Sequence, residues 1–169
     1  MSATGMFPAT SETVETGDRE ARTPGELIYE YTPQITQVVE YGCGADAVLS
    51  GRKAPPAEGA RFDFYLEGLV SGPKLRGTMR GVDYIYFRAD GRADLHVHAE
   101  ITTEDGKKLA LEAGGVAIGQ PGSPLFQLRE HVSLISNHPE LAWVNPIEVW
   151  ARGVVDVSTG QVHVRGYAG

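Results

Sequence analysis

The segment Ala93–Thr102, with the sequence ADLHVHAEIT, concentrates ionisable side chains at alternate positions. In an extended strand this spacing places Asp94, His96, His98 and Glu100 on one face, opposite an apolar face. A histidine beside a carboxylate is a common arrangement for a general base, because the carboxylate fixes its tautomer. If this face lines a cavity, His96 or His98 is the catalytic base, and Glu100 or Asp94 orients it.

Two other interpretations of the same segment stay open. The polar face of a strand often points to water while its apolar face fills the core. Alternatively, Gly91, His96-Val97-His98 and Glu104 look like the first metal-binding motif of cupins. Gly91 is one residue too near, Glu104 is too far from His98, and no later Gly-Pro-Gly and His segment follows. We therefore predict no metal site and keep a cupin-like, metal-dependent enzyme as an alternative.

Asp83 is a second candidate, because alternation places it on one strand face with Ile85 and Phe87. A carboxyl among apolar neighbours has a raised pKa unless it is paired. The alternative is a turn aspartate that follows Gly81.

Four further residues are candidates for substrate binding. Arg88, Tyr84 or Asn145 could hold a developing oxyanion, and Trp143 with Asn145 could cap a pocket. A plain core position is the alternative for Trp143. The chain contains no Ser-His-Asp order, phosphate loop or dinucleotide fingerprint, so we expect chemistry without a cofactor, or simple binding.

The elements that must position these residues are strands. From Glu26 onward, short segments rich in Val, Ile, Tyr and Phe alternate with Gly, Pro and Asp-Gly. Asp90-Gly91 and Asp105-Gly106 predict two hairpin turns around a strand from Asp94 to Thr103. One short helix or turn is expected after His138-Pro139. The other expected strands are Leu27–Tyr31, Thr36–Tyr41, Phe62–Leu66, Val82–Arg88, Lys108–Ala113, Leu125–Ser133, Ile147–Arg152 and Val162–Tyr167.

So many antiparallel strands favour an all-β fold, a single antiparallel β-barrel with a central small-molecule cavity, because closure removes the exposed sheet edges. A β-sandwich is the alternative. The net charge of −7 disfavours nucleic acid, and no apolar stretch is long enough to span a membrane. With Cys43 as the single cysteine and no signal-peptide pattern, we expect a cytoplasmic protein.

Several segments together resemble the DUF3237 family of uncharacterised bacterial and fungal proteins, also called UPF0311. The resemblance implies a lipocalin-like barrel, often a homodimer, and implies no established activity. Members tend to carry Asp and Arg at the positions that align with His96 and His98, which suggests that this face lines the cavity. The segments are LEGLVSGPKLRGTM (66–79), Val82-Asp83-Tyr84, 88–91, 103–106, Gly114-Gly115 and 141–145.

These features lead to one main functional hypothesis. The protein would be a cofactor-independent lyase or isomerase that uses acid–base chemistry on a small aromatic or carbonyl compound. A non-catalytic barrel that binds an apolar metabolite is the alternative from another class.

Residues 1–23 differ in composition from the predicted barrel domain, 24–169. They are rich in Thr, Ser, Glu and Gly and poor in large apolar side chains, so we expect a flexible tail. An arm that becomes ordered against a partner subunit is the alternative.

Deletion of residues 1–23 should leave the thermal unfolding midpoint of the remaining chain unchanged, because this segment has little apolar surface to bury. The measurement is thermal unfolding of both chains at matched protein concentration. A large fall in the midpoint would instead indicate an ordered arm.

Overall fold

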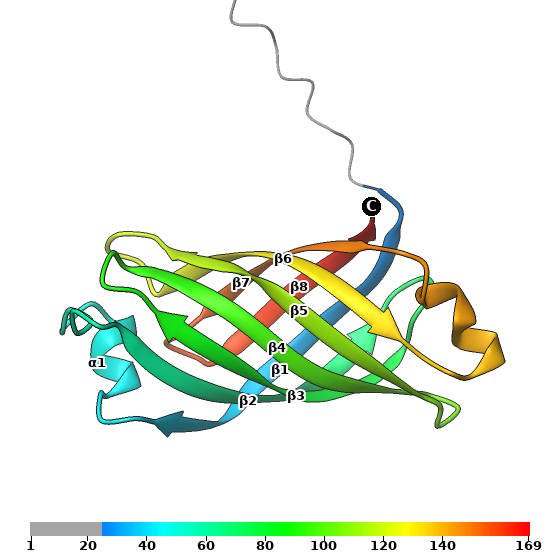
Figure 1. Ribbon diagram of the computed structural model, residues 1–169, viewed down its shortest axis with the longest axis horizontal. Helices are drawn as coiled ribbons and strands as arrows, with labels where there is room; N and C mark the ends of the chain where they lie inside the picture. Colours follow the sequence, from blue (N-terminus) through cyan, green and yellow to red (C-terminus); the bar gives the residue numbers. More distant parts are fainter. Residues whose placement is uncertain (1–24) are drawn as a thin grey trace, which may run out of the picture.

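The computed structural model describes residues 25–169, so the predicted tail over residues 1–23 lies outside the described residues. Eight antiparallel strands form a closed barrel in which neighbours in sequence are neighbours in space, and β8 pairs with β1 (Figure 1). The predicted all-β barrel is confirmed. The strands are β1 Leu27–Glu40, β2 Ala60–Ser71, β3 Gly77–Phe87, β4 Arg92–Thr103, β5 Lys108–Gly119, β6 Leu125–Ile135, β7 Val149–Asp156 and β8 Gln161–Ala168.

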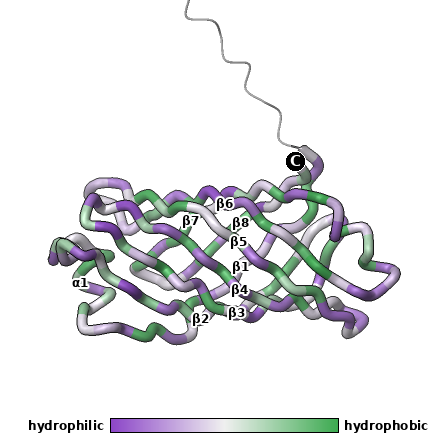
Figure 2. The backbone as a smooth tube through the Cα atoms, viewed as in Figure 1, coloured by the Kyte–Doolittle hydropathy of each residue, from purple (hydrophilic) through white to green (hydrophobic). Residues whose placement is uncertain are grey.

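Alternation of apolar and polar side chains explains which face of each strand turns inward. In β2, for example, Phe62, Phe64 and Leu66 are buried, while Arg61, Tyr65 and Glu67 on the opposite face are exposed. Asp63, on the same face as Arg61, is the exception and is covered by its contacts with Arg61 and Tyr41. The hydropathy of the chain alternates along most strands in the same way (Figure 2). The inner faces of all eight strands therefore form one apolar core.

The first strand differs from the prediction of two separate strands, Leu27–Tyr31 and Thr36–Tyr41. Both segments belong to one continuous strand, β1, whose register against β2 shifts between Ile35 and Gln37. Pro33 lies within it and has no pairing partner on β8, which suits a residue without an N–H to donate.

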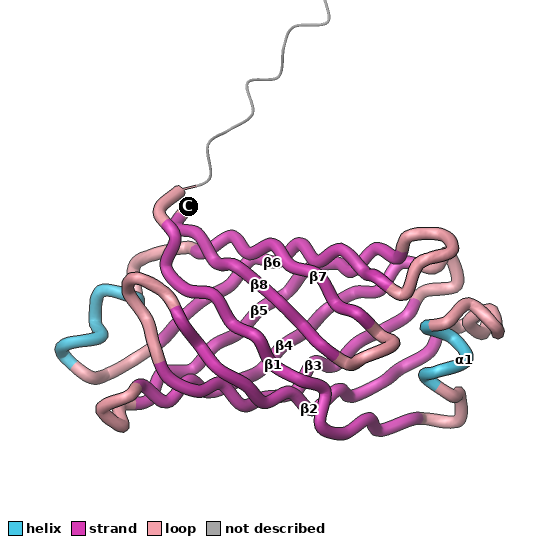
Figure 3. The backbone as a smooth tube through the Cα atoms, turned by 180° about the vertical axis from the view of Figure 1, so that it is seen from behind, coloured by secondary structure: helices cyan, strands magenta, loops and turns pink. Residues whose placement is uncertain are grey.

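Short helices lie at the two ends of the barrel (Figure 3). The 3-10 helix η1, Pro139–Val144, occupies the position predicted after His138-Pro139 and buries Leu141 and Val144. The helix α1, Ala45–Leu49, was not predicted, because five residues are too few for a helical pattern in the sequence. No helix in residues 25–169 is long and apolar enough to cross a membrane.

The two predicted Asp-Gly hairpin turns are confirmed. Gly91 and Gly106 have φ angles of 85° and 82°, a conformation that side chains with a Cβ rarely adopt. In each turn the glycine N–H donates to a backbone carbonyl three residues earlier, at Arg88 and Thr103.

Gly115 marks a place where β5 and β6 approach too closely for a side chain on β5. It lies opposite Glu130, and a Cβ on Gly115 would lie 2.0 Å from the Arg129 carbonyl oxygen. The adjacent Gly114 differs, because a Cβ there would meet only the ring of the exposed His131, at 2.8 Å.

The substitution Gly115→Ala should lower the free energy of unfolding by about 1–3 kcal/mol, because the new methyl group collides with backbone that cannot move without distorting the barrel. Gly114→Ala is the matched control, since the His131 ring can turn away. Denaturant unfolding of both variants measures the difference. Equal effects would show that the close approach at Gly115 does not limit stability.

Candidate functional site

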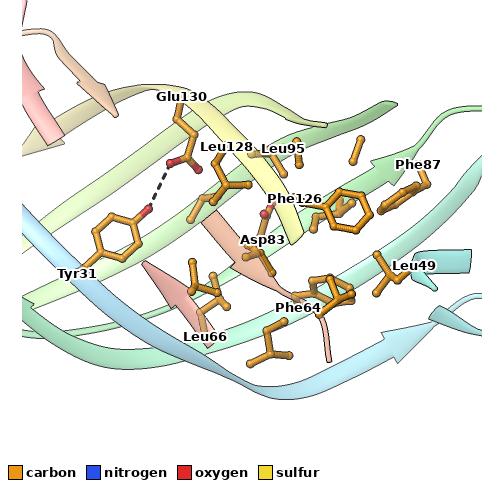
Figure 4. A pocket seen from close by; sticks show the side chains of 18 residues that line it. Tyr31, Leu49, Phe64, Leu66, Asp83, Phe87, Leu95, Phe126, Leu128 and Glu130 are labelled. Atoms are coloured by element: carbon orange, nitrogen blue, oxygen red, sulfur yellow. Dashed lines mark hydrogen bonds between the residues drawn. The ribbon is translucent and has the colours of Figure 1, made fainter. Parts of the chain in front are cut away.

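The barrel contains a cavity of about 50 Å³, whose lining side chains are drawn in Figure 4. Its walls are almost entirely apolar, with Phe64, Phe87 and Phe126 among the larger side chains, and Leu49 of α1 contributes to the wall. Small residues on the inner faces of β4 and β5, Ala93 and Ala117, also line it. An apolar lining with few polar groups is the usual form of a small-molecule site, but such sites enclose about 300–1,000 Å³. At about 50 Å³ this cavity has room for only a few atoms, so a larger ligand requires the lining side chains to move apart.

Two carboxyl groups interrupt this apolar lining. Asp83 of β3 and Glu130 of β6 point into the cavity from different parts of the wall, and their exposed fractions are only 7% and 4%. Tyr31 of β1 supplies the third polar group of the lining. No lysine, arginine or histidine is among the residues that line the cavity.

Hydrogen bonds hold both carboxyl groups in place. The Tyr31 hydroxyl donates to Glu130 Oε2 over 3.3 Å, as the dashed line in Figure 4 shows. The backbone N–H of His96 donates to Asp83 Oδ1 over 2.9 Å. The pairing of β3 with β4 is interrupted beside this contact, between Asp83 and Tyr86.

Burial changes the acidity of both groups. Loss of hydration raises the pKa of Asp83 to about 7, and the hydrogen bond from the His96 N–H partly opposes this rise. Burial also raises the pKa of Glu130 to about 7, and the nearby charge of Asp83 adds to the effect. Near neutral pH, each carboxyl group can therefore either give or accept a proton.

A third buried carboxylate, Asp63, has a cationic partner, which Asp83 and Glu130 do not have in the described part of the chain. Asp63 is also buried, but Arg61 Nε and the Tyr41 hydroxyl each lie 2.7 Å from its oxygens. Asp83 and Glu130 have no ion pair with any described residue. Buried carboxyl groups without a cation are costly to a fold, and such groups cluster at functional sites.

The predicted catalytic residues lie outside the cavity. His96 and His98 are exposed on the outer wall, so the expectation that both rings point into the barrel is wrong. Asp94 and Glu100 share this outer face and form ion pairs there, Asp94 with Arg92 and Glu100 with Arg80 and Lys108. The physical reason is that the apolar face of β4, with Leu95 and Val97, fills the closed interior.

Of the predicted substrate-binding residues, only Asp83 reaches the cavity. The predicted position of Asp83 among apolar neighbours is confirmed, and burial there raises its pKa, whereas the alternative of a turn aspartate is wrong because Asp83 lies within β3. Tyr84 lies beside His96 and His98, with ring centroids 6.4 and 6.0 Å away. Arg88 forms an ion pair with Asp90 in a turn.

Trp143 and Asn145 do not cap the cavity. Trp143 lies in η1 and packs against the core, as its alternative interpretation stated. The Asn145 amide group donates to the Ser136 carbonyl oxygen and accepts from the Ser136 N–H, with a length of 2.9 Å for each hydrogen bond. Asn145 therefore holds the end of η1 against the residue that follows β6.

Glu130 and Tyr31 are the cavity residues that the sequence analysis missed. Glu130 lies on one face of β6 with the apolar residues Phe126, Leu128 and Val132, so alternation alone could have singled it out. Nothing in the sequence shows that this carboxyl group faces Asp83 across two intervening strands.

The cupin-like alternative loses its geometric basis, because its two histidines would have to point into the barrel. Within residues 25–169, no three side chains of His, Cys, Asp or Glu converge as a metal site would need.

The raised pKa of Asp83 leads to a prediction about stability. Between pH 4 and 7 the unfolded chain has lost the Asp83 proton while the folded chain keeps it, so the free energy of unfolding falls as pH rises. Asp83→Asn removes this loss and keeps an oxygen that can accept from the His96 N–H. At pH 8 the variant should be more stable by about 1–3 kcal/mol, with the difference shrinking toward pH 4.

Denaturant unfolding at pH 4 to 8 measures this effect, and Asp105→Asn is its control. Hydrogen bonds from Lys107 and Thr103 lower the pKa of Asp105 to about 2, so neutralisation there should give no stabilisation at pH 8. A less stable Asp83→Asn variant at pH 8 would contradict the raised pKa of Asp83.

Comparison with solved structures finds barrels of the same kind. A protein of unknown function from Clostridium acetobutylicum matches with a TM-score of 0.70, over 85% of this chain and 97% of its own. A β-barrel-like protein from Acinetobacter baumannii matches with 0.66, over 85% and 93%. A structure described as an enzyme from Penicillium herquei matches with 0.56, over 87% and 96%. All three are 17% identical to this chain, so they show the fold alone.

No curated protein matches the chain. A family model does match it, over residues 58–168, and its description is a protein of unknown function. The matched region runs from just before β2 to the end of β8, and it contains both cavity carboxyl groups. The chain therefore belongs to the DUF3237 family.

Proposed function

We propose that the protein is a cofactor-independent lyase or isomerase that uses acid–base chemistry on a small carbonyl or aromatic compound. The observation that carries this proposal is the pair of buried carboxyl groups, Asp83 and Glu130, inside an apolar cavity. General acid–base catalysis usually depends on titratable groups whose pKa values lie near neutral pH and which are sheltered from bulk water.

The surroundings of the two groups assign them different roles. The His96 N–H donates to Asp83 and so favours its ionised form, which makes Asp83 the base. The charge of Asp83 raises the pKa of Glu130 and outweighs the hydrogen bond from the Tyr31 hydroxyl, which lowers it, so Glu130 is the acid. Two carboxyl groups with different environments thus divide the acid and base functions.

The proposed reaction begins with a carbon acid, a compound with a C–H bond beside a carbonyl group. The Asp83 carboxylate removes the proton from that carbon, the electron pair of the C–H bond forms a C=C bond to the carbonyl carbon, and the π electrons of the carbonyl group move to its oxygen. Glu130 gives its proton to that oxygen, so an enol forms without a net change of charge. Return of a proton to another carbon gives an isomerase, and loss of a leaving group gives a lyase.

The cavity lining favours an uncharged substrate. It contains no cation to pair with a carboxylate or phosphate, and two carboxyl groups would repel an anion. The rings of Phe64, Phe87 and Phe126 offer an apolar surface for an aromatic or cyclic compound, which enters once these side chains move apart and enlarge the cavity of about 50 Å³.

Two features of the comparisons and the sequence bear on this proposal. The Penicillium herquei protein of similar fold is described as an enzyme, which is compatible with catalysis in such a barrel.

The single cysteine favours a cytoplasmic location, and assembly as a homodimer stays a prediction.

The alternative is a binding protein that holds an apolar metabolite in the same cavity without turnover. Its basis is the predominance of apolar side chains in the lining. The two functions differ in the role of Asp83. Catalysis needs its carboxylate as a general base, whereas binding of an uncharged apolar ligand does not.

The test is hydrogen exchange in D₂O with a set of small cyclic and aromatic ketones as probes. The protein should speed the appearance of deuterium at the carbon beside the carbonyl group, followed by NMR. Asp83→Asn should lower this rate by about 10²–10⁴-fold, the usual contribution of a general base, and Glu130→Gln should lower it as well. His98→Gln should leave the rate unchanged, because its ring lies outside the barrel.

Ketone binding without any protein-dependent exchange would favour the binding function over catalysis. Exchange that Asp83→Asn leaves at the wild-type rate would show that another group is the base.

A further inference from the structure

The outer wall of the barrel carries a second cluster of chemically useful groups, independent of the cavity. His96 and His98 are two residues apart on β4, so their side chains stand side by side on its exposed face. Their Nε2 atoms lie 3.0 Å apart, and the ring centroids lie 4.8 Å apart. This contact is a hydrogen bond between the two rings, one nitrogen donating and the other accepting. Two exposed imidazoles this close can turn to direct both nitrogens at one metal ion, which is the first requirement of a chelating site.

The distance between the two nitrogen atoms fits metal coordination. An imidazole nitrogen binds a first-row divalent metal at about 2.0–2.1 Å, so two nitrogens at right angles around the metal lie about 2.9 Å apart. A tetrahedral arrangement would separate them by about 3.4 Å. The observed 3.0 Å is close to the separation of adjacent positions in a square-planar or tetragonal site, the geometries that Cu²⁺ and Ni²⁺ prefer, so a metal ion could replace the hydrogen bond between the rings with little movement of the two nitrogens.

The surroundings of the pair are compatible with a bound cation. On one side the Tyr84 ring contacts both imidazoles, and Arg61 stacks on that ring 5.1 Å from its centroid. The charge of Arg61 is balanced, because its Nε lies 2.7 Å from Asp63 Oδ1.

On the other side, β5 leaves the pair open to solvent. Gly114 lies opposite His96 and has no side chain of its own, and the His131 ring of β6 lies over it, 2.8 Å from where a Cβ would be. Glu112 lies opposite His98 on the exposed face and adds a negative charge beside the site. Water can therefore occupy the coordination positions that the two histidines leave free.

We propose that His96 and His98 form a two-histidine chelating site on the outer wall of the barrel for a late first-row divalent metal ion. Cu²⁺ binds most tightly, followed by Ni²⁺ and Zn²⁺, as the general order of divalent affinities requires. The site is separate from the cavity and does not depend on the proposed catalytic function.

The test uses Cu²⁺ alone, titrated into the full chain at pH 7.5, with calorimetry and electron paramagnetic resonance. One equivalent should bind with hyperfine coupling from two nitrogen atoms. His96→Gln and His98→Gln should each weaken binding by about 10²-fold, because the second ligand of a chelate binds at high effective concentration. Both rings are exposed, so these variants should keep the wild-type unfolding midpoint.

His138→Gln is the matched control. His138 is an exposed histidine that precedes η1 and lies outside β4 and the two strands paired with it, so this variant should bind Cu²⁺ as the wild type does. Unchanged Cu²⁺ binding in the His96→Gln/His98→Gln double variant would overturn the proposal, as would the absence of binding at millimolar Cu²⁺ in the wild type.

Discussion

Hydrogen bonding between the first and last strands closes the sheet, and the position of every other side chain depends on this closure. β1 pairs with β8 from Leu27 to Gln34, so the described barrel has no unpaired edge between these strands. Each strand then has one face toward a sealed interior and one toward solvent. A side chain on the inner face loses its water, and this loss determines the chemistry that it can perform.

The two cavity carboxyl groups occupy inner positions of the barrel, where burial favours apolar side chains and disfavours charged ones. Most inner positions hold apolar side chains, yet Asp83 and Glu130 are buried with one hydrogen-bond donor each and no cation among the described residues. Natural sequences depart from consistent core patterning mainly at functional sites, where stability is exchanged for reactivity. The same burial that destabilises these groups keeps both of them close to neutral-pH titration.

The strand β4 contributes side chains to both the inner and the outer face of the barrel wall. Leu95 and Val97 pack inside, while His96 and His98 lie outside. His96 nevertheless contributes to the cavity, through its backbone N–H rather than its ring. The residue that the sequence analysis placed at the centre of catalysis therefore acts on Asp83 by fixing its position and favouring its charge.

The sequence by itself indicated most of the strands and the Asp-Gly turns at Gly91 and Gly106, and it offered the burial of Asp83 as one of two interpretations, because period-2 alternation and turn chemistry are local properties. It also separated His96 and His98 from Leu95 and Val97 as two faces of β4. Only the tertiary structure decided which of these faces is inside and which distant strand brings Glu130 near Asp83. The physical reason is that alternation divides the side chains of a strand between two faces but does not say which face is the inner one. That distinction exists only after the sheet has closed into a barrel.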